Sequence, residues 1–250
     1  MLLPLEFLQE KIKFAHPQSG LIVLGNSRGY PEFQEKLNNV FVKQFKYLLY
    51  IVYDYQDNYF IQSLLGSSWA LHKITARAIL DGSIDSRTLI DLFQVNPRLI
   101  ISVKELSASI RIKYWQLLNT QIRKFFVEGH VESIPHAFVW LDKSLFIEDI
   151  ETYEYFRLLN LWGDDYGLRF GLSLDSYANL SYPARTLFNI FILFPGVQSH
   201  EVKELVDNLD TDRKMKSYLY QQYYQLKPHQ ALVVSRLKMF EPFILDIQIP

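Results

Sequence analysis

The hydrophobic residues of the chain follow two alternating patterns. Short uninterrupted apolar runs are typical of strands buried on both faces of a parallel sheet. They alternate with longer segments whose apolar residues recur every three or four positions, as on one face of a helix. The first apolar run is Leu21–Leu24, and the segment that begins with Pro31 places Phe33, Leu37 and Phe41 on one helical face. This part of the chain is therefore predicted to form a strand, a turn and a helix.

The same alternation continues through the rest of the chain. Further strands are predicted at Tyr47–Tyr53, Leu99–Ser102, Ala137–Leu141, Leu168–Leu174, Asn189–Phe194, Ala231–Arg236 and Phe243–Ile249. Helices are predicted at Leu5–Ala15, Lys104–Glu128, Ile147–Trp162, Ser199–Leu209 and Thr211–Tyr224, and across Phe60–Phe93 with a break at Asp81–Gly82. This order predicts an α/β fold with a mainly parallel central sheet and helices on both faces. The short connection between the last two strands predicts a C-terminal β-hairpin.

The length, charge balance and cysteine count narrow the class of protein. We predict a single domain over 1–250, with 60–97 as a candidate helical insertion. The 26 Lys and Arg against 27 Asp and Glu give a formal net charge of -1, so any contact with nucleic acid needs a local basic patch. The absence of cysteine excludes disulfides and cysteine-ligated metal sites. No apolar run reaches the roughly 18 residues of a membrane-spanning helix, and we predict a cytoplasmic protein.

The turn after the first strand contains the first candidate site. A phosphate-binding P-loop reads G-x-x-x-x-G-K-[ST]: backbone N–H groups cradle the phosphates, the lysine neutralises them and the hydroxyl helps to hold magnesium. The corresponding frame here is Gly25, Asn26, Ser27, Arg28, Gly29, Tyr30, Pro31 and Glu32. Tyr30 replaces the second glycine, Pro31 removes the cation and an N–H donor, and Glu32 puts negative charge at the positive end of a helix. We interpret this stretch as a degenerate P-loop.

Three aspartates follow other predicted strands. Asp54 ends the second strand, and Asp142 ends an apolar run in the manner of a Walker B motif. Lys143 stands where the water-activating glutamate of that motif belongs, so the general base is missing. Asp175 follows a later strand, in the place of a sensor residue. Asp54 and Asp142 are predicted to end adjacent strands, where they could bind a metal ion together or cap neighbouring turns.

In their order and spacing, these segments resemble the FtsK/HerA superfamily of DNA-pumping P-loop ATPases over nearly the whole chain. The resemblance implies a three-layer, RecA-like fold, ring-shaped oligomers, DNA as a partner, and ATP with magnesium. The mismatches at Tyr30, Pro31, Glu32 and Lys143 favour an inactive homologue that uses no cofactor. Such a chain would serve as a structural or regulatory subunit, assembled with itself or with an active relative, and DNA is a candidate partner.

The sequence leaves two alternative functions open. One is an active ATP-dependent DNA translocase or packaging ATPase with a divergent site that uses ATP and magnesium. The other is a nucleic-acid-binding protein that does not depend on ATP. Its candidate contacts are basic groups and a tyrosine cluster that could stack on bases. These residues are Arg111, Lys113, Arg123, Lys124, Arg213, Lys214, Lys216, Tyr218, Tyr220, Tyr223 and Tyr224. Solvated helix faces and core packing are the simpler explanations for them.

Overall fold

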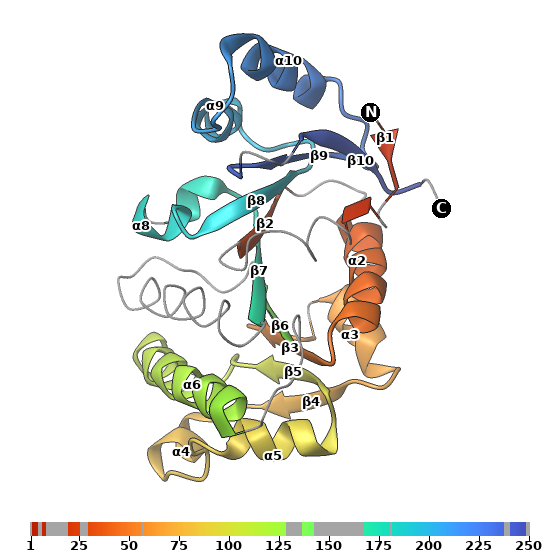
Figure 1. Ribbon diagram of the computed structural model, residues 1–250. Coiled ribbons are helices and arrows are strands. Elements are labelled where there is room, and N and C mark those ends of the chain that lie inside the picture. Colours follow the sequence, from red (N-terminus) through yellow and green to blue (C-terminus); the bar gives the residue numbers. More distant parts are fainter. Residues whose placement is uncertain are drawn as a thin grey trace.

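A mainly parallel sheet runs through the molecule (Figure 1). The computed structural model describes residues 2–4, 7–8, 20–25, 30–56, 58–128, 137–142, 168–180, 182–237 and 241–248. In spatial order, the ten strands found in these residues are β1 (Leu2–Leu3), β10 (Phe243–Asp246), β9 (Gln230–Ser235), β8 (Phe188–Leu193), β2 (Gly20–Leu24), β7 (Leu168–Leu174), β6 (Ala137–Leu141), β3 (Tyr47–Val52), β5 (Arg98–Ser102) and β4 (Ala70–Lys73).

Strand direction confirms the predicted fold class. Neighbouring strands are parallel, except that β9 is antiparallel to both β8 and β10. The strands β9 and β10 therefore form the predicted C-terminal hairpin. The two strands β6 and β7 have the bounds that the apolar runs predicted, because each run is buried along its whole length.

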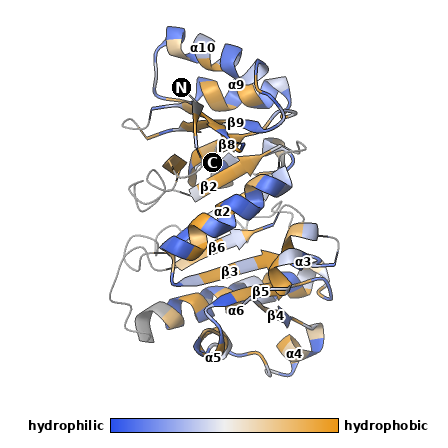
Figure 2. Cartoon of the chain, turned by 90° about the vertical axis from the view of Figure 1, so that its right-hand side faces the viewer, coloured by the Kyte–Doolittle hydropathy of each residue, from blue (hydrophilic) through white to orange (hydrophobic). Residues whose placement is uncertain are grey.

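Helices cover both faces of the sheet because successive side chains of a strand point in opposite directions. In β2, Leu21 and Val23 belong to one hydrophobic core, and Ile22 and Leu24 belong to the other. Helices α2 (Tyr30–Gln44) and α3 (Tyr59–Leu65) contribute to the first core, and α5 (Thr88–Val95), α6 (Ala108–Glu128), α9 (Ser199–Asp207) and α10 (Arg213–Tyr224) contribute to the second. Figure 2 shows α2 lying across the first face, with hydrophilic residues turned away from the sheet.

The segment predicted as helical over Phe60–Phe93 contains a strand. After α3, the chain forms β4, then α4 (Ala76–Leu80) and α5. The four residues of β4 pair in parallel with β5 at the edge of the sheet, and none of them is fully buried. A half-exposed edge strand this short has no continuous apolar run, so the sequence pattern did not predict it. The assignment of 60–97 as an insertion stays a prediction.

Two of the predicted helices lie wholly or mostly outside the residues that the structure describes. The helix predicted at Ile147–Trp162 lies outside them, as does most of the helix predicted at Leu5–Ala15. Two short helices, η1 (Tyr177–Asn179) and α8 (Tyr182–Arg185), connect β7 to β8. Across the ranges that the structure describes, no helix has both the length and the apolar character needed to cross a membrane.

The centre of the sheet has no room for a side chain at Gly171 of β7. A Cβ atom added there would lie 2.6 Å from Cζ3 of Trp140 and 2.9 Å from Cζ of Phe138. Both rings are buried, and they stack with their centroids 6.1 Å apart. Neither ring can move without disturbing the other, so the glycine allows β7 to pack beside the aromatic residues of β6.

We expect the substitution Gly171→Ala to lower the free energy of unfolding by about 1–3 kcal/mol because it overpacks this contact. Equilibrium unfolding in urea would measure the change. Gly66→Ala is the matched control, since an added Cβ there meets only the Ser63 carbonyl at 3.5 Å and φ is -74. Equal stability of the two variants would contradict this account of the core.

Candidate functional site

The residues singled out from the sequence gather at one edge of the sheet. Strands β2, β7, β6 and β3 lie side by side and run parallel, so their carboxyl ends meet at the same edge. Gly25, Asp175, Asp142 and Asp54 follow these strands. Ligands of open α/β sheets bind at this edge, which makes it the candidate site.

The turn after β2 begins with a glycine that no other residue replaces easily. Gly25 has φ +102, in the left-handed region, and a Cβ there would lie 3.1 Å from both Cβ and the carbonyl oxygen of Phe194. Its N–H donates to the Leu174 carbonyl at 3.2 Å. The first glycine of the P-loop frame is therefore required by backbone conformation and by close packing. Asn26, Ser27, Arg28 and Gly29 lie outside the described residues.

Helix α2 begins at Tyr30, and this tyrosine is buried at the edge. Its ring packs edge-on against Phe194, with centroids 5.8 Å apart. Its hydroxyl accepts a hydrogen bond from Nε2 of Gln34 at 3.2 Å and is hydrogen-bonded to the Ser173 side chain. Burial raises the pKa of Tyr30, and the negative charge of Asp142 raises it further. The residue in the second-glycine position is therefore a neutral phenol near the Walker B-like aspartate.

Asp142 is buried, and both of its carboxylate oxygens are hydrogen-bonded. Oδ2 accepts from Nδ2 of Asn58 at 2.7 Å, and Oδ1 accepts from Oγ of Ser173 at 3.3 Å. Its backbone N–H donates to the Ile51 carbonyl of β3 at 3.0 Å. A buried carboxylate is costly unless donors of this kind surround it. Asp142 therefore links β6 to β7, β3 and the start of α3.

Asn58 was not predicted as a site residue. It precedes α3, and its Oδ1 accepts from the Ile61 N–H at 3.1 Å, which makes it the N-cap of that helix. An asparagine ahead of a helical pattern is a recognisable cap signal. The same side chain also donates to Asp142, which is 84 positions away in sequence. Only the tertiary structure could show that second contact.

Asp54 has its own partners. Its carboxylate forms an ion pair with Lys104 and accepts from the Gln56 N–H at 2.9 Å. These two interactions, the Lys104 contact first, hold the pKa of Asp54 below its ordinary value of 3.8. Strands β3 and β6 are adjacent, as predicted for Asp54 and Asp142. Among the residues that the structure describes, no group of three or more His, Cys, Asp or Glu side chains is arranged to hold a metal ion.

The surroundings of the remaining predicted residues differ from one another. Pro31 is exposed, and Glu32 lies on the exposed side of α2, where its Oε1 is 3.7 Å from Nζ of Lys36. Asp175 is exposed as well, but it lies close enough to the site for its negative charge to raise the pKa of Tyr30. Lys143 lies outside the described residues. The carboxylate of Glu32 is therefore engaged along its own helix.

By sequence, no family model and no curated protein matches this chain. By structure, it is similar to the genome packaging NTPase B204 from Sulfolobus turreted icosahedral virus 2 in complex with sulfate. The TM-score is 0.58 at 11% identity, and the match covers 92% of this chain and 96% of that chain. VirB4 of Thermoanaerobacter pseudethanolicus matches with a TM-score of 0.58 at 8% identity, covering 93% of this chain and 90% of VirB4.

A third similar structure is the cytoplasmic domain of the type VII secretion ATPase EccC from Thermomonospora curvata. Its TM-score is 0.52 at 12% identity, and the match covers 92% of this chain and 25% of EccC. These matches, together with the sheet and its edge, define the class: the chain has a P-loop NTPase fold. The similar structures themselves are FtsK/HerA-type P-loop ATPases, the superfamily that the sequence resembles.

The similar structures contradict one prediction. B204 was also solved in complex with AMPPCP and with ATP-gammaS, and both complexes match this chain with a TM-score of 0.55. The expectation of no cofactor is therefore wrong. It gave the side chains of Tyr30, Pro31 and Glu32 too much weight. Phosphate binding in this fold depends largely on backbone N–H groups at a glycine turn and a helix N-terminus, which a comparison of side chains does not assess.

The ion pair at Asp54 gives a pH-dependent prediction. A carboxyl group with a lowered pKa stabilises the fold above its unfolded pKa, and that stabilisation disappears as the pH falls through the folded pKa. We expect Lys104→Gln to raise the pKa of Asp54 toward 3.8. The variant should therefore be less stable than the wild type at neutral pH, and the two should converge in more acidic solution.

Unfolding in urea across this pH range would measure the difference, and carboxyl NMR would follow Asp54 directly. Lys113→Gln, which removes an exposed cation from helix α6 shortly after Lys104 in the chain, is the control and should not shift the pKa of Asp54. A stability loss in Lys104→Gln that is independent of pH would contradict the assignment.

Proposed function

We propose that this chain is a structural or regulatory subunit of a DNA-translocation-type assembly and that it does not hydrolyse ATP at a useful rate. The observation that carries the proposal is the hydrogen bonding of Asp142 at the carboxyl edge of the sheet. Asp142 is enclosed by Asn58 and Ser173, and the neutral hydroxyl of Tyr30 lies beside them. In P-loop NTPases, the corresponding aspartate and a P-loop hydroxyl hold magnesium between them.

The lack of a general base supports the proposed inactivity. ATP hydrolysis needs a group that orients or deprotonates the attacking water, and Lys143 stands in the position of that group in the sequence. Pro31 replaces the lysine that would neutralise the phosphates. Removal of even one preorganised hydrogen-bond donor from a catalytic site costs about 3–4 kcal/mol of transition-state stabilisation. The chain departs from the motif at both positions.

Nucleotide binding without turnover is part of the proposal. The observation that supports nucleotide binding is Gly25, whose left-handed conformation suits a phosphate-binding glycine turn ahead of helix α2. To hold a magnesium ion bound with the nucleotide, Asp142 would have to exchange its hydrogen bond from Asn58 or Ser173 for the ion. A bound nucleotide would supply phosphate charge at this edge. The residues of this chain would position the nucleotide at the sheet edge. Tyr30 and Asn58 would determine the hydrogen bonding and the electrostatic surroundings of Asp142 beside it.

The similar structures support the kind of assembly. B204 is described as a genome packaging NTPase, and VirB4 and EccC have the same fold. We therefore propose that the chain forms an oligomer with itself or with an active relative, and that DNA is the partner. The cytoplasmic location stays a prediction from the sequence.

A second function is an active DNA translocase or packaging ATPase with a divergent site. The observation in its favour is that B204, which has this fold, was solved with ATP analogues. It would require the unusual residues at the start of α2 to support turnover. The two functions differ in one measurable property, which is the rate of ATP hydrolysis that depends on Asp142.

We expect the purified chain to bind a fluorescent ATP analogue in the presence of magnesium. We also expect it to release phosphate from ATP at least about a hundredfold more slowly than the roughly 10 per second of a typical enzyme. Addition of duplex DNA should not restore turnover. Asp142→Asn, which keeps the shape of the side chain and removes its charge, should leave the residual rate unchanged.

Circular dichroism would verify that Asp142→Asn is folded. Phosphate release by the wild type that is stimulated by DNA and abolished in Asp142→Asn would overturn the proposed inactivity and favour the active translocase. A chain that binds no nucleotide under any condition would remove the nucleotide-binding part of the proposal.

A further inference from the structure

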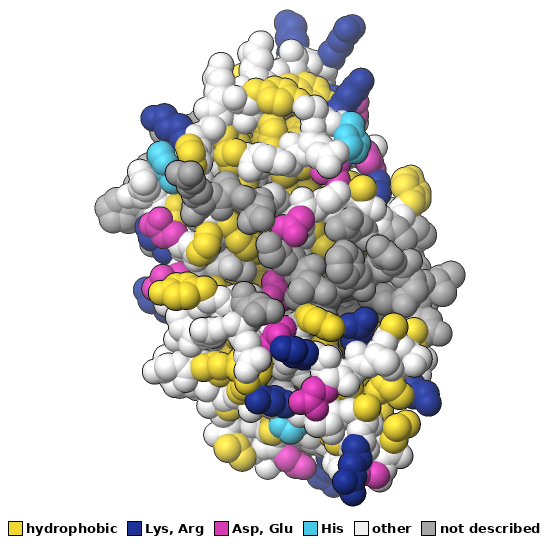
Figure 3. Space-filling model, turned by 180° about the vertical axis from the view of Figure 1, so that it is seen from behind, with side chains coloured by type: hydrophobic (Ala, Val, Ile, Leu, Met, Phe, Trp, Pro, Cys, Tyr) yellow, Lys and Arg dark blue, Asp and Glu magenta, His cyan; other side chains and the backbone are white. Residues whose placement is uncertain are grey.

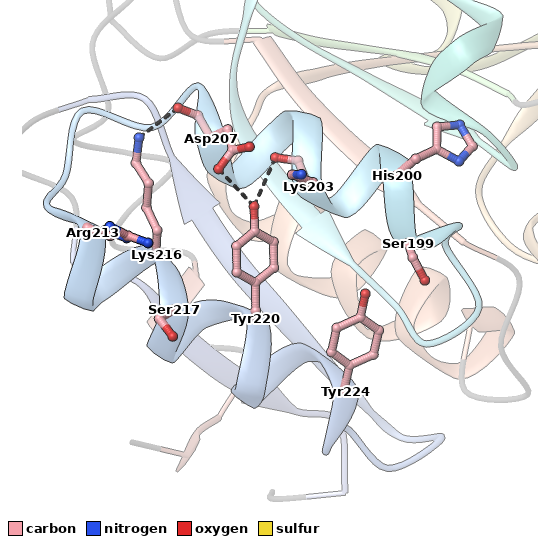
Figure 4. Close-up of a pocket in the computed structure, with 9 residues that line it drawn as sticks. All are labelled: Ser199, His200, Lys203, Asp207, Arg213, Lys216, Ser217, Tyr220 and Tyr224. Carbon is pink, nitrogen blue, oxygen red and sulfur yellow. Dashed lines mark hydrogen bonds between the residues drawn. The ribbon is translucent and has the colours of Figure 1, made fainter.

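Helices α9 and α10 lie at the end of the molecule beyond β8 and β9 (Figure 1). Residues of both helices line a groove there (Figure 4). Its volume is about 660 Å³, and both helices line it. Figure 4 shows Ser199 and Tyr224 toward one end, and Asp207, Arg213 and Lys216 toward the other. This space, named here the α9–α10 groove, lies away from the candidate nucleotide edge described above.

Cations outnumber carboxylates in the lining of the α9–α10 groove. Lys203, Arg213 and Lys216 line it together with a single carboxylate, Asp207. The Tyr220 hydroxyl donates to Oδ1 of Asp207 at 2.9 Å, and Nζ of Lys216 donates to the Asp207 carbonyl at 2.7 Å. Burial and the Asp207 contact raise the pKa of Tyr220 to about 12, so the hydroxyl keeps its proton. Asp207 is therefore already engaged by a donor from α10.

The outer surface of α10 is also positively charged, like the lining of the groove. The helix sequence RKMKSYLYQQYY contains three cations and no acidic residue. Figure 3 shows Lys and Arg side chains projecting at the end of the molecule where α10 lies. Tyr218 and Tyr224 are 47% and 60% exposed on the same helix. In a chain with a formal net charge of -1, this is a local basic and aromatic surface.

One end of the groove is connected to the Gly25 turn. The hydroxyl of Tyr223 donates to the carbonyls of Phe194 and Val197, at 3.0 and 3.2 Å. These are the two residues that an added Cβ at Gly25 would meet. The end of α10 that carries Tyr224 is thus fixed to the segment packed over the nucleotide turn. The groove extends from there along α9 and α10.

We propose that the α9–α10 groove binds the phosphodiester backbone of DNA. The inference rests on the proposed function in taking DNA as the partner, and it assigns that partner a site. Lysine, arginine and hydroxyl side chains are the usual ligands of DNA phosphates, and here Lys203, Arg213, Lys216, Ser199 and Tyr224 converge on one groove. The exposed Tyr218 and Tyr224 add hydroxyl donors for phosphate oxygens to the basic residues of the same surface.

The test is fluorescence anisotropy of a labelled DNA duplex with the full chain over a series of salt concentrations. Each phosphate contact contributes about 0.9 to the slope of log K against log salt. We expect Arg213→Gln/Lys216→Gln to reduce that slope by roughly 2 and to weaken binding more than about tenfold near 0.1 M salt. Asp207→Asn should tighten binding, because it removes the only carboxylate in the groove lining that the structure describes.

The control variant is Arg77→Gln/Lys113→Gln, which removes the same charge from exposed positions on α4 and α6. It should bind DNA nearly as the wild type does. Equal weakening in both double variants, or wild-type binding by Arg213→Gln/Lys216→Gln, would overturn the groove assignment and leave the proposed function in place. Failure of the wild type to bind DNA would remove both the groove site and the DNA partner.

Two further outcomes would also overturn the assignment. Displacement of DNA by polyglutamate as efficiently as by unlabelled DNA would identify a surface for acidic proteins. A change of native mass in Arg213→Gln/Lys216→Gln with unaltered DNA affinity would identify the groove as a contact between copies of the chain. The gain in affinity expected for Asp207→Asn cannot arise from unfolding, so it separates a specific effect from damage to the fold.

Discussion

Burial of the central strands on both faces is the constraint on which the rest of the structure depends. Strand β2 is fully buried, and its successive residues alternate between two hydrophobic cores. Helices must then cover both faces, and the neighbouring strands must run parallel with helical crossovers between them. The carboxyl ends of β2, β7, β6 and β3 consequently meet at one edge. The candidate site exists because of this geometry.

The polar residues at that edge satisfy one another. Asp142 is enclosed by donors from Asn58 and Ser173, and a neutral Tyr30 lies beside it. Such a network offsets the cost of burying a carboxylate. It also joins α2, β6 and β7 to the start of α3. A fold that is shared with packaging and secretion ATPases at 8–12% identity can therefore carry a different set of side chains, since function resides in the site and not in the fold.

The proposed nucleotide site at Gly25 and the proposed DNA site in the α9–α10 groove are connected through the same residues. Phe194 and Val197 pack against Gly25, and their carbonyls accept hydrogen bonds from Tyr223 of α10. Gly25 and helix α10 thus both contact the segment that follows β8. Under the two proposals made above, nucleotide and DNA would share this structural element without contacting each other.

The sequence by itself determined the α/β class, the bounds of β6 and β7, and the placement of Asp54 and Asp142 at the ends of adjacent strands. It could do so because a strand buried on both faces leaves an unbroken apolar run. Strand β4 left no such run, because it is short and lies half-exposed at the sheet edge. The position of β7 between β2 and β6, the contact of Asn58 with Asp142 and the pairing of Lys104 with Asp54 were decided only by the tertiary structure. Each of these joins residues far apart in the chain, and local patterns of hydrophobic and polar residues do not encode such contacts.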